Sequence, residues 1–222
     1  MLFVSDGKTL DIDTSRVINA GYAGCDQDVV KAHIDELAAI GVSVPKRVPT
    51  FYPVPSMQLT QGGSIQVGHG KTSAEVEYVF IRSGEKAYIT VGSDHSDRWL
   101  ESFSVSAAKQ ICPNVVASEL WDYDTVKDHL DLLILRCRVL KDGVWTLYQE
   151  GPVTAILPPE KLTELGRGVV PEEGDMVLYS GTIPTIGEIY FGSRWRISLT
   201  DGLLGRTIET EYSVEVLPES IE

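Results

Sequence analysis

Two glutamates stand one residue apart in a segment that otherwise reads as an apolar β-strand, Glu75-Val-Glu-Tyr-Val-Phe-Ile81. Side chains alternate between the two faces of a strand, so Glu75, Glu77, Val79 and Ile81 all lie on the same face. Two carboxylates on such a face point into a pocket or the inside of a barrel, where burial is costly unless a positive charge compensates it. On this pair alone, a solvated acidic edge strand is the other interpretation.

A third carboxylate, Asp94, follows the next apolar segment. A divalent cation would offset the mutual repulsion of three carboxylates that are brought together. Carboxylate oxygens with coordination positions left open suit Mg²⁺ or Mn²⁺, hard ions that keep water or take substrate oxygens. Glu75, Glu77 and Asp94 are therefore the candidate metal ligands.

The bulk composition narrows the class of protein. The chain has 222 residues, the size of one large domain, and its net charge of −13 argues against a nucleic-acid partner. No run reaches the ~18 apolar residues of a membrane helix, and the N-terminus lacks a basic region before an apolar run, so we expect neither membrane insertion nor a signal peptide. Three cysteines without a CxxC motif fit a reducing compartment, and we expect a cytoplasmic protein.

The first part of the chain mixes short elements. Residues 2–13 predict a hairpin that turns at Asp6-Gly7. A helix is predicted over 27–40, with Asp26 as N-cap and Gly41 as its stop, and this places His33 and Glu36 on one face. The proline-rich run 45–55 cannot be helical and predicts an extended connector that lines or covers a pocket.

From about residue 64 onward, short apolar segments alternate with Gly, Asp and Pro, which is typical of β-structure. The expected strands cover 64–68, 75–81, 86–92, 132–139, 144–149, 176–179, 188–190, 194–199 and 208–216. The expected short helices lie near 98–110, 122–128 and 159–164. We therefore predict an α+β, mostly β protein: a roll or barrel over 61–222 with a small α/β portion over 1–60, forming one functional unit.

Five short motifs occur in an order that resembles the fumarylacetoacetate hydrolase superfamily. They are His33-Ile-Asp-Glu36, Glu75-Val-Glu77, Asp94-His-Ser-Asp-Arg98, Lys109-Gln-Ile-Cys-Pro113 and Glu173-Gly-Asp-Met-Val-Leu-Tyr-Ser-Gly-Thr182. Each motif is short, and the resemblance depends on their common order. It covers the chain from about residue 18 to its end.

The resemblance implies a mixed β-roll and a site in which Glu75, Glu77 and Asp94 hold Mg²⁺ or Mn²⁺. It implies that Lys109 is catalytic and that His33, oriented by Glu36, is the general base. Taken alone, His33 and Glu36 could equally be a surface pair on a helix.

Three further residues are implied as substrate-binding: Arg98, Thr182 and Tyr22. For Arg98 the alternative is a brace for the Asp94 loop, and for Thr182 it is a plain turn. The chain departs from the family at Glu101, where many members carry glutamine, and this difference bears on the substrate.

The activity implied is metal-dependent, on a small 2-keto or β-diketo acid, through a metal-stabilised enolate. Hydrolytic C–C cleavage of an acylpyruvate-like acid is the first expectation. Hydration or decarboxylation of a 2-keto acid on the same site, as a hydratase or lyase, is the alternative, and a non-catalytic keto-acid-binding protein is the rival from another class. The expected partners are a small carboxylate substrate and a second copy in a homodimer, with Tyr190, Phe191 and Trp195 at the interface.

Overall fold

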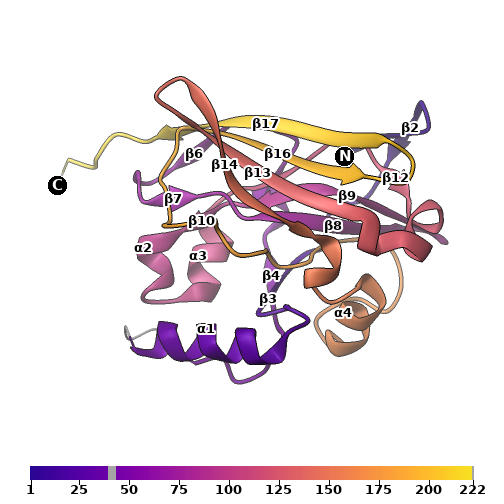
Figure 1. The fold of residues 1–222 in the computed structure, drawn as a ribbon, viewed down its shortest axis with the longest axis horizontal. Coiled ribbons are helices and arrows are strands. Elements are labelled where there is room, and N and C mark those ends of the chain that lie inside the picture. The colour runs from indigo at the N-terminus through magenta and orange to yellow at the C-terminus, as the bar shows by residue number, and fades with distance from the viewer. Residues whose placement is uncertain (40–43, 222) are drawn as a thin grey trace.

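The computed structural model describes residues 1–39 and 44–221, without the side chains of four residues in the first helix (33, 36, 37 and 39). Two sheets form the body of the molecule, and the α-helices lie on the opposite side from the five-stranded sheet (Figure 1). The strands are β1 (Leu2–Ser5), β2 (Lys8–Asp11), β3 (Val17–Gly21), β4 (Thr50–Val54), β5 (Leu59–Thr60), β6 (Gly63–Val67), β7 (Thr72–Ser73), β8 (Val76–Ser83), β9 (Lys86–Asp94), β10 (Ser96–Asp97), β11 (Asn114–Val116), β12 (Trp121–Asp122), β13 (Leu133–Lys141), β14 (Val144–Pro152), β15 (Met176–Tyr179), β16 (Arg194–Asp201) and β17 (Arg206–Val216). The α-helices are α1 (Gln27–Ala39), α2 (Arg98–Glu101), α3 (Val105–Ile111) and α4 (Pro159–Leu165), and the 3₁₀ helices are η1 (Ser56–Gln58), η2 (Tyr123–Thr125), η3 (Lys127–Leu132) and η4 (Val153–Ala155).

The larger sheet has the order β4-β3-β15-β8-β9-β11-β5, and β12 pairs with β9 beside this path. It is strongly curled. Asn114 of β11 donates a hydrogen bond from Nδ2 to Oδ1 of Asn19 on β3, at 2.7 Å. Three strands lie between β3 and β11, and in a flat sheet they would separate the two side chains by well over 10 Å at about 4.8 Å per strand. The sheet therefore encloses an interior, as a half-closed barrel does.

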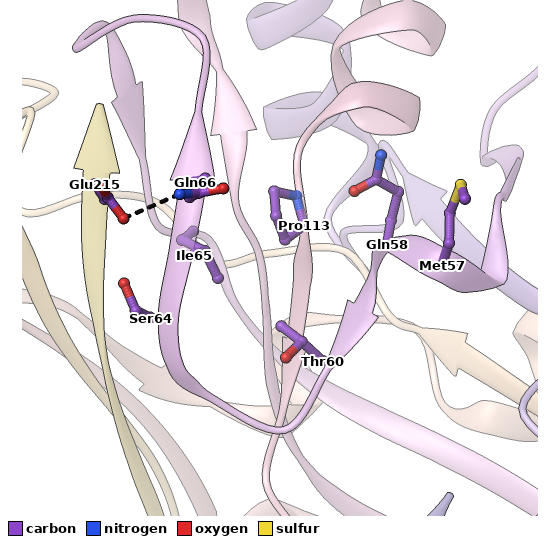
Figure 2. Close-up of a pocket in the computed structure, with 8 residues that line it drawn as sticks. All are labelled: Met57, Gln58, Thr60, Ser64, Ile65, Gln66, Pro113 and Glu215. Atoms are coloured by element: carbon purple, nitrogen blue, oxygen red, sulfur yellow. Dashed lines mark hydrogen bonds between the residues drawn. The ribbon is translucent and has the colours of Figure 1, made fainter. Parts of the chain in front are cut away.

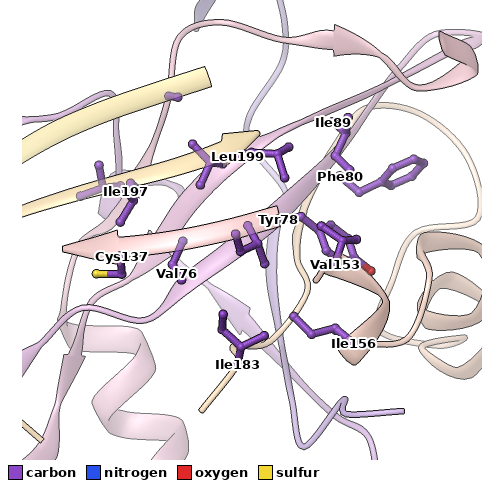
Figure 3. Packing of buried hydrophobic residues seen from close by; sticks show 14 of the residues in the cluster. Val76, Tyr78, Phe80, Ile89, Cys137, Val153, Ile156, Ile183, Ile197 and Leu199 are labelled. Atoms are coloured by element: carbon purple, nitrogen blue, oxygen red, sulfur yellow. The ribbon is translucent and has the colours of Figure 1, made fainter. Parts of the chain in front are cut away.

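The second sheet, β14-β13-β16-β17-β6, packs against one face of β8 and β9. Figure 3 shows Val76, Tyr78 and Phe80 of β8 in the same cluster as Ile197 and Leu199 of β16. Val79 and Ile81, which alternate with them, belong to a second buried cluster on the other side. Strand β8 is thus buried on both faces, which explains why its sequence is apolar almost throughout.

The helix ends follow capping rules. Asp26 accepts hydrogen bonds from the backbone N–H groups of Asp28 and Val29 at the start of α1, and the side chains of Asp97 and Ser104 cap α2 and α3 in the same way. Among the described residues, no helix has the length and apolar character that crossing a membrane requires.

The mostly β α+β fold and the hairpin at Asp6-Gly7 are confirmed. Three predictions need correction. Residues 188–190 are not a strand, and part of the proline-rich run, β4, pairs with β3 at the edge of the larger sheet, where Pro53 is tolerated. Trp195 is fully buried in the core, so it cannot contribute to a dimer interface. The predicted helix stop at Gly41 lies outside the described residues, and the division at residue 60 stays a prediction.

Candidate metal and active site

The three predicted ligands come together on one hairpin, β8–β9. Val76 pairs with Ser93 and Glu77 with Gly92, and the backbone N–H of Asp94 donates to the carbonyl of Glu75 at 3.1 Å. Glu75 and Asp94 therefore lie opposite each other, two residues along the hairpin from the pair formed by Glu77 and Gly92. One oxygen from each of the three carboxylates lies within 4.8 Å of the others, and all three residues are buried.

Two cations contact this acidic cluster. Lys109, on α3, places Nζ 3.1 Å from Oε2 of Glu75 and also donates to Oδ2 of Asp94. Arg98 donates from Nη1 to Glu75 Oε1 at 2.7 Å and to Glu101 Oε2 at 2.9 Å. If all groups are ionised, the three carboxylates of the cluster and that of Glu101 face only Lys109 and Arg98. Two negative charges then remain unbalanced among these six groups.

The pKa values of the three carboxylates diverge because their neighbours differ. Burial alone would raise the pKa of Glu75, but Lys109 and Arg98 outweigh it and lower the pKa to about 2. Burial, and then the charge of Asp94, raises the pKa of Glu77 well above its usual range. Burial raises the pKa of Asp94 to about 6, although Lys109 opposes the shift. Glu75 is thus stably charged, while Glu77 and Asp94 favour their protonated forms because no neighbouring cation fully offsets their charge.

A divalent cation fits this arrangement. Oε1 of Glu77 and Oδ1 of Asp94 are buried and have no hydrogen-bond partner among the described residues. The other oxygen of Glu77 is held at 2.7 Å by the backbone N–H of Gly181. Two unpaired carboxylate oxygens, a third carboxylate within reach and two excess negative charges match what a hard divalent ion requires.

Two glycines are adjacent to Glu77, one across the hairpin and one in the loop that holds its carboxylate. Gly92 lies directly opposite it on β9, and a Cβ there would come within 2.6 Å of the Tyr179 ring and of Val79, and within 2.8 Å of the Val115 carbonyl. Gly181 has φ +89°, which a residue with a side chain adopts only with strain. Gly92 thus makes room for the Tyr179 ring beside the hairpin, and Gly181 allows the loop to present its N–H to Glu77 Oε2.

The other predicted residues are placed as follows. Arg98 donates to Ser73, Glu75 and Glu101, which fits the brace interpretation. The hydroxyl of Thr182 donates to the carbonyl of Val76 at 2.8 Å. Tyr22 is half-buried with φ 55°, and burial, followed by the neighbouring Tyr52 and Glu101, raises its pKa to about 12. His33 and Glu36 fall on α1, but their side chains lie outside the described part of the structure.

Sequence reasoning missed several residues near the cluster. Tyr52 of β4 pairs with Asn19 of β3, and its ring lies against Gly21, where a side chain would collide with it. Asn114 pairs with Asp94 across β9 and β11, so its side chain shares the face of that carboxylate. Gln149 contacts the backbone between the two glutamates. No local sequence motif marks any of these residues, because the curl of the larger sheet and the packing of the second sheet bring them near the site.

Two alternative nucleophile or base candidates have structural roles. His95 is buried and uses both ring nitrogens, at 3.1 Å from the Tyr212 hydroxyl and 2.9 Å from the Thr72 hydroxyl. Cys112 is buried, and burial raises its pKa to about 12, which keeps it a thiol.

A surface groove of about 450 Å³ lies elsewhere, between η1, β5 and β6 (Figure 2). It is lined by Met57, Gln58, Thr60, Ser64, Ile65, Gln66, Pro113 and Glu215. None of the candidate site residues lines it, so it contributes nothing to the acidic cluster.

The pKa of Asp94 predicts an unusual pH dependence for the metal-free protein. In the folded state Asp94 keeps its proton up to about pH 6, whereas in the unfolded chain it loses the proton at a lower pH. The free energy of unfolding therefore falls as the pH rises toward 6. The raised pKa of Glu77 acts in the same direction. Glu75 contributes little change above about pH 5, because there the carboxylate is charged both in the folded state, where its pKa is about 2, and in the unfolded chain. We expect the melting temperature in EDTA to be lower at about pH 7.5 than at about pH 5, and Mg²⁺ to raise it more at the higher pH.

Thermal unfolding followed by fluorescence, with and without Mg²⁺, checks this expectation. Asp94→Asn is the matched variant, since it should remove much of the decrease in melting temperature between about pH 5 and pH 7.5. Stability in EDTA that rises between about pH 5 and pH 7.5 would contradict the assignment of the excess charge to this cluster.

Comparison with solved structures shows the fold. A candidate fumarylacetoacetate isomerase/hydrolase from Oleispira antarctica aligns with TM-score 0.70 at 16% identity, over 96% of this chain and 99% of that chain. A candidate fumarylpyruvate hydrolase from Burkholderia cenocepacia aligns with TM-score 0.68 at 18% identity, over 98% and 92%. A 2-keto-3-deoxy-D-arabinonate dehydratase complexed with magnesium and 2,5-dioxopentanoate aligns with TM-score 0.65 at 15% identity, over 93% and 75%.

These likenesses confirm, at the level of the fold, the resemblance to the fumarylacetoacetate hydrolase superfamily. No curated protein matches the sequence. A family described as "Protein of unknown function (DUF2848)" matches residues 20–212. The chain therefore belongs to the DUF2848 family.

Proposed function

We propose that this protein is a divalent-metal-dependent enzyme that acts on a small 2-keto or β-diketo acid, and that the reaction is hydrolytic C–C cleavage. The observation that carries the proposal is the buried cluster of Glu75, Glu77 and Asp94, in which one oxygen from each carboxylate lies within 4.8 Å of the others. Two oxygens of the cluster, one from Glu77 and one from Asp94, have no hydrogen-bond partner among the described residues. Proteins that share the fold include the candidate fumarylpyruvate hydrolase and the dehydratase complexed with magnesium.

Glu75, Glu77 and Asp94 would hold Mg²⁺ or Mn²⁺, which supplies Lewis-acid polarisation of a substrate oxygen. Lys109 has three N–H donors, and the contacts with Glu75 and Asp94 occupy two of them. Its third donor and positive charge would stabilise an oxyanion that develops on the substrate. The phenol of Tyr22 stays protonated because its pKa is raised to about 12, so it is a donor for the substrate carboxylate.

His33 would act as general base, and Glu36 would hold the tautomer of its imidazole. For hydrolysis, the imidazole takes a proton from the water that attacks the carbonyl carbon, and later returns it to the carbon that leaves. Arg98 would hold Glu75 in place, and Thr182 would orient the segment that contacts the substrate.

Two alternatives use the same residues. A hydratase would use the same cluster to add water across a carbon–carbon double bond, and a decarboxylase would use it to release CO₂ and return a proton to the carbon left behind. A keto-acid-binding protein would need the cluster but no base. The effect of His33 on turnover separates this binding protein from an enzyme.

Replacement of His33 by alanine is expected to lower turnover by about 10²–10⁴-fold while leaving Mg²⁺ binding unchanged, because the residue moves protons and does not hold the ion. The measurement is a turnover screen of acylpyruvates, oxaloacetate and unsaturated 2-keto acids with Mg²⁺ or Mn²⁺, alongside calorimetry of Mg²⁺ binding. Lys31→Ala, on the exposed face of the same helix, is the control and should behave as the unaltered protein.

Metal-dependent turnover that survives in His33→Ala would remove His33 from the mechanism. Binding of oxalate or pyruvate with Mg²⁺, without turnover of any substrate in the panel, would favour the binding protein.

We also propose a homodimer. Tyr190 and Phe191 are partly exposed, at 36% and 47%, in an irregular segment where such apolar side chains are available for a partner surface. Light scattering at micromolar concentration should report twice the 24.4 kDa chain mass, and a monomer would remove this proposal.

A further inference from the structure

Gln149 is almost completely buried, with 1% of its surface exposed, although it lies on β14 of the other sheet. A β-bulge turns it inward. Cys137 pairs with Gln149 but Arg138 pairs with Leu147, so Tyr148 is an extra residue in the register. Because of the bulge, the consecutive residues Tyr148 and Gln149 are both buried, which regular alternation would not allow.

The amide of Gln149 contacts the one residue that separates the two glutamates. Its Oε1 accepts a hydrogen bond from the backbone N–H of Val76 at 3.0 Å. Its Nε2 donates to Thr182 Oγ1 at 2.9 Å and to the carbonyl of Ile183 at 2.6 Å. Thr182 in turn donates to the carbonyl of Val76 at 2.8 Å. The N–H and the C=O of Val76 are therefore held by two connected side chains.

The hydrogen bonds from Gln149 and Thr182 to Val76 take the place of a neighbouring strand. On the side of β8 that faces away from β9, the partner strand β15 ends at Tyr179, opposite Val79. The last backbone contact toward β8 is the bond from the N–H of Ser180 to the carbonyl of Tyr78. Without Gln149 and Thr182, the N–H and C=O of Val76 would be buried without partners, and such groups are costly to leave unpaired.

The same contacts control where the carboxylates point. The N–H of Val76 belongs to the peptide that joins it to Glu75, and its C=O belongs to the peptide that joins it to Glu77. Gln149 also fixes Ile183, two residues from the Gly181 N–H that holds Glu77 Oε2 at 2.7 Å. One side chain thus sets both the strand that carries the glutamates and the loop that orients one of them.

We infer that Gln149 is a positioning residue for the metal site, acting through the Val76 peptides and the 181–183 loop on Glu75 and Glu77. The inference rests on the metal site of the proposed function. It predicts that Gln149 determines the affinity for the divalent ion without touching the ion.

The test compares Gln149→Met with the unaltered protein. Methionine has a similar volume and no charge, and it removes the bonds to Val76, Thr182 and Ile183. We expect calorimetry to show Mg²⁺ and Mn²⁺ binding weakened about 10–100-fold, the range typical of outer-shell partners of metal ligands. Gln66→Met, the same change on the exposed side of β6, should leave the affinity unchanged.

A purely structural role would lower the unfolding temperature of Gln149→Met without changing ion affinity in the folded protein, and that result overturns the inference. A second measurement needs no variant: in the unaltered protein, the side-chain amide resonances of Gln149 should shift as Mg²⁺ is added, with the same midpoint as the calorimetric binding. Gln149 resonances that do not move also overturn it.

The failures are distinguishable. If the unaltered protein binds neither ion, the proposed metal site fails and this inference fails with it. If the unaltered protein binds and Gln149→Met binds equally well, only the inference fails.

Discussion

Glutamine at position 77 is expected to abolish binding of the divalent ion at concentrations that saturate the unaltered protein. Glu77 supplies a buried oxygen, Oε1, without a partner among the described residues, while its other oxygen is already held by Gly181. The amide keeps the size of the side chain but removes the negative charge that the ion requires. Loss of a direct ligand should exceed the 10–100-fold effect of an outer-shell partner, so we expect binding weakened by more than about 100-fold, and turnover lost with it.

Glu85→Gln is the matched control, since Glu85 is exposed at the turn of the same hairpin. Calorimetry with Mg²⁺ and Mn²⁺ on both variants measures the difference. The Glu77→Gln protein should also melt higher than the unaltered protein in EDTA, because a buried carboxylate with a strongly raised pKa has been neutralised. Undiminished ion binding by Glu77→Gln would remove Glu77 from the metal site.

Methionine at position 109 should cause the largest loss of stability in the absence of metal. Lys109 is buried and contacts Glu75 and Asp94, so its removal leaves Asp94 without a cation and Glu75 with Arg98 alone. Breaking a buried ion pair in this way costs about 3–5 kcal/mol of unfolding free energy. Mg²⁺ should restore part of the loss, because the ion supplies positive charge to the same carboxylates.

Urea unfolding in EDTA and in Mg²⁺ measures both effects. The control is Lys127→Met, which breaks a surface pair with Asp124 and should change little in either condition. A Lys109→Met protein as stable as the unaltered one in EDTA would show that Lys109 does not neutralise the cluster.

The sequence predicted those parts of the fold that depend on local pattern. Alternation along 75–81 correctly placed Glu77, Val79 and Ile81 on one face, and Asp6-Gly7 marked a hairpin because both residues accept positive φ. The order of motifs predicted the shared fold, which comparison with solved structures confirms. The roles of the site residues stay predictions.

Other features depend on long-range contacts that no local pattern encodes. Tyr52 lies in a proline-rich run that excludes a helix but does not reveal the pairing of β4 with β3. Gln149 ends the strand predicted over 144–149, and only the bulge at Tyr148 turns it inward. Asn19 and Asn114 are far apart in the chain and meet because the sheet curls. Residues 188–190 have β-propensity but pair with no strand in the part of the chain that the structure describes, so propensity alone misplaced a strand there.

The position of the three acidic residues on a single hairpin has a consequence for folding order. Strands β8 and β9 are adjacent in the chain and pair from a tight turn, so this hairpin has the low sequence separation of an early-forming unit. Its open end, however, gathers three carboxylates and no cation, and like charges on facing strands disfavour pairing. The compensating charges arrive with Arg98 of α2 and Lys109 of α3. Closure of this end should therefore occur together with helix docking, so that pairing starts at the turn of the hairpin and is completed only when α2 and α3 pack against it.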